Sequence, residues 1–159
     1  MNYSPKDTPW NFDTTYEINS YKIEFKRLRN FAKEGPLCGQ LYINNKLVNC
    51  PMECDGFGGP PLITQEYIYT PVYQRGIGGF FDIDGGVIAE INLRNMSVRI
   101  IGEKYDVINM AYIKGERLYF YDSCIKGESP LRSVGIKEGY KPWTLWDKLK
   151  YTYYSFKKM

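Results

Sequence analysis

The stretch that most limits the fold runs from Asp55 to Gly86 and reads DGFGGPPLITQEYIYTPVYQRGIGGFFDIDGG. Glycine reaches positive φ at little cost, and proline fixes a turn while removing a backbone donor, so clusters of both are typical of tight turns between strands. The stretch predicts a β protein with short strands between its turns, and it indicates no chemistry. Its glycines and prolines are Gly56, Gly58, Gly59, Pro60, Pro61, Pro71, Gly76, Gly78, Gly79, Gly85 and Gly86.

Three further segments have the pattern of β-hairpins, in which alternating apolar residues flank a short polar turn. Short strands at a spacing near ten residues predict a mainly β fold: an antiparallel meander that is propeller-like, a sandwich or an open barrel. The hairpins are Gln40 to Cys50 around Asn44-Asn45, Val87 to Ile101 around Arg94-Asn95-Met96, and Ile108 to Tyr121 around Lys114-Gly115-Glu116.

Tyr16 to Ala32 fits two patterns. Tyr21, Ile23 and Phe25 alternate with charged residues, which predicts a half-buried strand. Tyr21, Phe25, Leu28 and Ala32 also match a helical stripe, so strand and helix both stay open for this segment.

The two ends of the chain lack the strand pattern of its middle. We expect a single domain over 1–159, with a flexible leader over 1–9. Residues 142–158 begin with Pro-Trp-Thr and then repeat apolar side chains at helical spacing, at Leu145, Trp146, Leu149 and Tyr153. This pattern predicts a C-terminal helix, and we expect it to pack on the sheet.

Charge and hydropathy exclude some partners. The net charge is only +3, with no basic run, and the segment from Pro51 to Gly102 carries more acidic than basic residues. Such a distribution is a poor match to nucleic acid. The absence of a long apolar run argues against a membrane partner, and the polar segment from Met1 to Asp13 argues against a signal peptide. We therefore expect a cytoplasmic protein with reduced cysteines.

The sequence contains no histidine, which removes the commonest catalytic bases and every histidine-containing metal site. A carboxylate-based hydrolase is still compatible with the sequence. Asp13, Glu24 and Lys26 match the loose pattern of metal-dependent nucleases, although Glu-x-Lys is also typical of a charged strand face.

Other motifs are incomplete, and we predict no cofactor and no metal. Asp82-Ile83-Asp84-Gly85-Gly86 lacks ligands that a calcium-binding EF-hand loop needs, and Gly76 to Gly79 lack the spacing of a phosphate loop. Zinc would need four cysteines without paired spacing, so we interpret them as buried thiols. They are Cys38, Cys50, Cys54 and Cys124.

Three strand segments, YIYTPVYQ, AEINLRNMSVRIIG and GERLYFYD, resemble those of the small β-rich immunity proteins that bacteria encode beside polymorphic or contact-dependent toxins. The resemblance covers roughly Gly58 to Asp122 and lies in the texture of short aromatic strands. It implies a protein that binds a cognate toxin domain and blocks its active site or substrate access.

The 15 tyrosines suit such a protein partner, because tyrosine packs its ring while its hydroxyl stays hydrogen-bonded. A ligand- or carbohydrate-binding β module is also possible, with a groove lined by Trp10, Trp143 or Trp146. For the toxin partner we predict that loops near the acidic stretch form the interface, with carboxylates facing a basic nuclease. This predicted binding surface consists of Asp55, Phe57, Tyr73, Arg75, Phe81, Asp82 and Asp84.

Overall fold

The computed structural model describes residues 7–75, 84–142 and 144–158. It confirms the mainly β prediction: antiparallel sheets, with a helix at the C-terminal end, and no closed barrel among the described residues. The strands are β1 Asp7–Thr8, β2 Asn11–Phe12, β3 Thr15–Ile18, β4 Tyr21–Asn30, β5 Leu37–Ile43, β6 Lys46–Leu47, β7 Gly56–Gly58, β8 Leu62–Ile63, β9 Tyr67–Gln74, β10 Gly85–Asn92, β11 Val98–Tyr105, β12 Asn109–Lys114, β13 Arg117–Tyr121 and β14 Arg132–Gly135, and the helix is α1 Leu145–Lys158.

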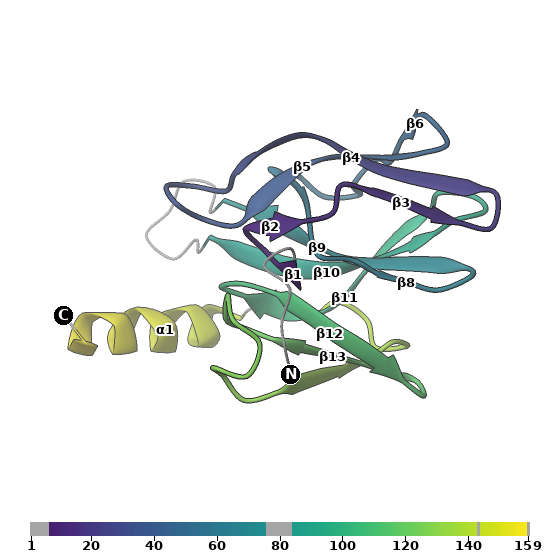
Figure 1. Ribbon diagram of the computed structural model, residues 1–159. Coiled ribbons are helices and arrows are strands. Elements are labelled where there is room, and N and C mark those ends of the chain that lie inside the picture. The colour runs from purple at the N-terminus through teal and green to yellow at the C-terminus, as the bar shows by residue number, and fades with distance from the viewer. Residues whose placement is uncertain (1–6, 76–83, 143, 159) are drawn as a thin grey trace.

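The main sheet has the order β11-β10-β9-β7-β5-β4-β3, with β6 added beside β5 and β8 beside β9. A second sheet, β12-β13-β14, lies below it in Figure 1, and the strands β3, β4 and β5 lie above β9 and β10. The strands β9 and β10 therefore form a middle layer between two outer layers.

The short strand β7 joins the upper strands to the middle layer. Gly58 pairs with Cys38 of β5, and Gly56 pairs with Tyr73 of β9. A Cβ on Gly58 would lie 2.6 Å from the ring of Tyr73, and one on Gly56 would lie 2.7 Å from the backbone of Gly39. Glycine is required here because neighbouring groups occupy the space of a side chain.

The middle layer is buried on both faces. Successive side chains of a strand point to opposite sides, and another layer covers each side. In β10, Val87, Ala89 and Ile91 enter a core shared with the upper strands, which includes Phe25 and Leu41. The residue between them in sequence, Ile88, enters a second core shared with the lower sheet, formed also by Tyr69, Ile101, Ile108, Met110, Leu118, Phe120 and Val134.

The three predicted hairpins are confirmed. Asn44 and Asn45 both have positive φ, at 49° and 64°, as a two-residue turn between β5 and β6 requires. The others are the pairs β10–β11 and β12–β13. Arg132–Gly135, which the hairpin patterns do not include, forms β14, the edge strand of the lower sheet.

The segment from Tyr16 to Ala32 consists of most of β3, a turn, the whole of β4 and the two residues after it, so the helical interpretation of it is wrong. Tyr16 belongs to β3, which pairs with β4 across a turn where Asn19 has φ 52°. Ile23 and Phe25 are buried and Lys22 is exposed, as the alternation predicts.

The expected leader over 1–9 is wrong for Asp7–Thr8, which pair with Asn11–Phe12 as β1 and β2. The carbonyl of Pro9 also accepts a hydrogen bond from the backbone N–H of Leu37, at 2.9 Å. Phe12 is buried against Phe25, so this segment is anchored to the upper core.

The C-terminal helix exists as predicted and begins with a capping box. The hydroxyl of Thr144 accepts a hydrogen bond from the backbone N–H of Asp147, and the Asp147 carboxylate accepts one from the Thr144 N–H. Our expectation that the helix packs on the sheet is wrong: α1 extends from one end of the sheets (Figure 1), and Trp146 is 73% exposed. The cores are formed by side chains from the strands and the loops between them. None of the three cores includes a described residue of α1.

Candidate functional site

The predicted binding surface is divided between core and surface. Phe57 and Tyr73 are 3% and 0% exposed, so they are core residues, and their assignment as aromatic anchors is wrong. The ring of Tyr73 stacks on Phe31 with centroids 5.3 Å apart, and burial raises the pKa of its hydroxyl. Phe81 and Asp82 lie outside the described residues.

The remaining members are Asp55, Arg75 and Asp84. The Nε of Arg75 donates to Oδ2 of Asp55 at 2.7 Å, so the charge of this carboxylate is matched within the protein. Asp84 is exposed just before β10. The structure therefore brings Asp55 and Arg75 together. Because its charge is paired with Arg75, Asp55 is poorly suited to face a basic partner.

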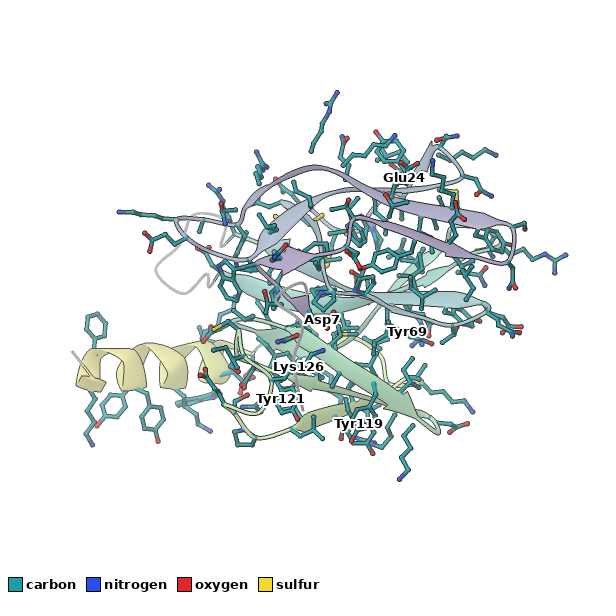
Figure 2. The ribbon with its side chains drawn as sticks, in the orientation of Figure 1. Asp7, Glu24, Tyr69, Tyr119, Tyr121 and Lys126 are labelled. Atoms are coloured by element: carbon teal, nitrogen blue, oxygen red, sulfur yellow. The ribbon has the colours of Figure 1, made fainter. Side chains whose placement is uncertain are left out.

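A second carboxylate of the acidic central segment is also paired. Glu90 on β10 lies 3.0 Å from the guanidinium of Arg99 and accepts a hydrogen bond from the hydroxyl of Tyr69 at 2.9 Å. Figure 2 shows Tyr69 at the level between the middle and lower layers. Burial, together with Glu90, raises the pKa of Tyr69. These ion pairs weaken the idea of a binding surface made of free acidic groups.

Exposed apolar side chains gather instead on α1. The α1 surface, as we call it, has side chains that are 60–73% exposed, whereas large apolar residues of the sheets are mostly buried. At 100° per residue, Leu145, Tyr153 and Phe156 fall on one side of the helix, with Trp146 beside them. The members of the α1 surface are Leu145, Trp146, Tyr153, Tyr154 and Phe156.

The α1 surface lies on a helix with a net positive charge. The helix sequence LWDKLKYTYYSFKK contains four lysines and one aspartate. The apolar spacing at Leu145, Leu149 and Tyr153 is visible in the sequence, where it predicted core residues. No local signal distinguishes a helix stripe that covers its own sheet from one that is left for a partner.

A pocket of about 480 Å³ lies at a bulge in β4. The register of β4 against β5 shifts between Lys26 and Arg29, and Arg27 has φ 54°. A Cβ on the facing Gly39 would lie 2.5 Å from the carbonyl of Lys26, so the bulge needs glycine opposite it. The pocket is lined by Arg27 and Arg29 and, across it, by the loop that carries Cys50 and Cys54.

The two cysteines of this loop interact. The Cys54 thiol and the backbone of Met52 interact with the Cys50 thiol and lower its pKa, and the same pairing raises the pKa of Cys54. Our interpretation of all four cysteines as buried thiols holds only for Cys38, since Cys50, Cys54 and Cys124 are half-buried.

Two residues of the nuclease pattern, Glu24 and Lys26, make contacts with other side chains. Glu24, labelled on the upper layer in Figure 2, lies 3.7 Å from the ammonium group of Lys22. The ammonium group of Lys26 lies over the ring of Tyr42, 4.8 Å from its centroid. Across residues 7–75, 84–142 and 144–158, no cluster of three or more cysteine or acidic residues could hold a metal ion.

The structure describes only part of the calcium-like motif and of the predicted carbohydrate groove. Gly85 and Gly86 of the calcium-like motif lie in β10, while Asp82 and Ile83 are outside the described residues. For the carbohydrate groove, Trp10 donates its indole N–H to the carbonyl of Glu34, and Trp143 is not described.

Comparisons with models of protein families, with curated proteins and with solved structures find no match. In the part of the chain that the structure describes, no helix has the length and apolar character needed to span a membrane.

Proposed function

We propose that this protein is an immunity protein, which binds and neutralises a cognate bacterial toxin domain, and that the α1 surface is its principal contact with that domain. The observation that carries the proposal is the exposure of four large apolar side chains on one side of the helix, Leu145, Trp146, Tyr153 and Phe156, with Tyr154 exposed on the other side. Soluble proteins rarely leave such a patch in water unless a partner covers it.

An amphipathic helix commonly binds by placing its apolar side in a groove of the partner, with anchors at helical spacing. Leu145, Tyr153 and Phe156 have that spacing, and Trp146 is of the residue type most enriched among binding hot spots. We therefore propose that the toxin domain offers an apolar groove of the width of one helix.

The charges of α1 define the partner further. Four lysines and one aspartate favour acidic groups beside that groove. This replaces our expectation of a basic toxin surface facing Asp55 and its neighbours, because Asp55 is already paired with Arg75. The immunity role itself is supported by the resemblance of the strands, and a binding role requires no catalytic group or cofactor.

We place this activity in the cytoplasm. Cys38, Cys50, Cys54 and Cys124 are all free thiols, as is usual where glutathione and thioredoxin keep cysteines reduced. A toxin delivered to that compartment would meet the protein in its active form.

The test uses the C-terminal domain of the protein encoded by the preceding reading frame. Cells that express this domain should lose viability and recover it when this protein is co-expressed. Trp146→Ala and Phe156→Ala should each weaken the purified complex by about 30-fold or more, the effect of a hot-spot residue. The matched control is Tyr112→Ala, another exposed aromatic residue, on β12, which should leave the affinity unchanged.

Two results would contradict the proposal. Failure of the protein to rescue such cells would remove the immunity function, while rescue that both α1 variants retain would remove the α1 surface from the interface. Sedimentation with anionic vesicles provides the third comparison, since a basic aromatic helix can also lie on a membrane. Binding to vesicles without binding to the toxin domain would favour a membrane partner.

A further inference from the structure

The pocket beside the bulge of β4 holds a second site that the proposed function does not use. Its loop, residues 48–55, is tied down at several points. The backbone N–H of Val48 donates to Leu41, and that of Asp55 donates to Tyr73, each at 2.8 Å. The side chain of Gln74 donates to the carbonyl of Glu53 at 2.7 Å. Cys50 and Cys54 are thus held beside an open pocket.

The two thiols line the same pocket, and their interaction lowers the pKa of Cys50, which favours its thiolate, while it raises the pKa of Cys54. This is the arrangement of an attacking thiol beside a resolving one.

We propose that Cys50 and Cys54 form a thiol–disulfide exchange site whose substrate is a low-molecular-weight disulfide that carries carboxylate groups, of the class of glutathione disulfide. The inference is independent of the toxin-binding proposal, because it uses other residues and a different ligand.

The reaction balances in two exchanges. The Cys50 thiolate attacks one sulfur of the small disulfide, forming a mixed disulfide and releasing one small thiolate, which takes a proton from water. Cys54 then loses its proton to solvent and attacks the sulfur of Cys50, releasing the second small thiolate, which takes a proton from water. Two protein thiols are oxidised to one disulfide while the small disulfide is reduced to two thiols.

The carboxylate specificity comes from Arg27 and Arg29, which line the same pocket. Within the described ranges neither guanidinium belongs to an ion pair, whereas Arg75 is already held by Asp55. The bulge with Arg27 at φ 54° lies where both arginines reach the pocket, from positions two apart on β4. Arginine suits carboxylates because its donors match the two carboxylate oxygens.

The expected gain in reactivity is moderate. The lowered pKa of Cys50 raises the fraction of this thiol that is thiolate at neutral pH. A more acidic thiolate is also a weaker nucleophile, with a Brønsted slope of about 0.4–0.5, so the two effects partly cancel. Cys38 is not exposed, and burial raises its pKa to about 11, so it should stay unmodified.

The test incubates the folded full-length protein with glutathione disulfide, stops the reaction with acid and maps the products by mass spectrometry. The wild type should accumulate an internal Cys50–Cys54 disulfide. Cys54→Ser should stop at a mixed disulfide on Cys50, and Cys50→Ser should lose fast reaction at this site. The matched control is Cys124→Ser, which removes the third half-buried thiol and should leave the reaction unchanged.

A second arm tests the carboxylate preference. Arg27→Asn, chosen because asparagine tolerates positive φ, and Arg29→Gln should each slow the reaction with glutathione disulfide by about two- to fivefold, the effect of an exposed ion pair. Neither should slow the reaction with neutral 2-hydroxyethyl disulfide. Modification of Cys124 before Cys50, or an internal disulfide that forms only after denaturation, would overturn the exchange site. Equal slowing with both reagents would overturn the carboxylate specificity.

Discussion

The strand β9 and the helix α1 are both rich in tyrosine, yet they use it in opposite ways. In β9, Tyr69 and Tyr73 are 3% and 0% exposed, whereas Tyr153 and Tyr154 of α1 are 62% and 61% exposed. The strand lies between two layers that cover both of its faces, and the helix extends from the end of the sheets (Figure 1). The sheets therefore complete their own cores, while the large apolar side chains of the helix are exposed.

The largest expected loss of stability comes from creating a cavity in the second core. Ile88→Ala removes a fully buried side chain from between the middle and lower layers and should lower the free energy of unfolding by about 2–5 kcal/mol, because a cavity remains. Urea denaturation measures it. Ile125→Ala is the matched control: Ile125 is 49% exposed, so its loss should stay within about 0.5 kcal/mol. Equal losses for both variants would show that Ile88 is not in a closed core.

The next effect tests the contact between the bulge of β4 and β5. Gly39→Ala would place a Cβ 2.5 Å from the carbonyl of Lys26, and should cost about 1–3 kcal/mol as the strands separate. The same denaturation experiment measures it. Gly139→Ala is the control, since a Cβ there meets nothing within 4 Å. A Gly39→Ala variant as stable as the wild type would argue against the close approach of these strands.

Much of the fold could be predicted because its information is local. The turn at Asn44-Asn45 and the alternation of Ile23 and Phe25 depend on the residues themselves, and both were confirmed. The order of strands could not be predicted, since β7 joins β5 to β9 through contacts between residues far apart in sequence. The strand β14 was missed because Arg132–Gly135 has only one buried residue, Val134.

The candidate site was harder to predict than the fold. Phe57 and Tyr73 follow turn-forming residues, which suggested exposure, but the layers above and below β9 bury them. The four cysteines were visible in the sequence, whereas the pocket beside Cys50 and Cys54 depends on a bulge in a distant strand. The apolar spacing of α1 was recognised, and its exposure follows only from the complete packing of the sheets.

A smaller effect is expected at the start of α1. Thr144→Ala removes the hydroxyl that accepts the N–H of Asp147 and should destabilise the helix by about 1 kcal/mol. Backbone amide exchange should show faster exchange in α1 and no change in β9 or β10. Faster exchange across the sheets as well would show that the helix and sheets unfold together.

The same cap predicts a dependence on pH. Hydrogen bonds from Thr144 lower the pKa of Asp147 below its ordinary 3.8, so its ionised form is favoured in the folded helix. Its stabilisation is present above the unfolded pKa and is lost as pH falls through the folded value. Helix content measured by circular dichroism should therefore decrease in acid, and Asp147→Asn should reduce that dependence. An identical acid profile for both proteins would contradict the cap's role.

The smallest expected effect on stability is that of Phe156→Ser. Phe156 is 60% exposed, so its replacement should change the free energy of unfolding by no more than about 0.5 kcal/mol. Full burial of a phenylalanine is worth about 1.5–3 kcal/mol, and a loss of that size in the free protein would show that α1 docks on its own sheets. In that case the residue could not serve a partner without first being released, and binding would carry that cost. An unchanged stability together with weakened binding therefore separates the surface of α1 from the closed cores around β9.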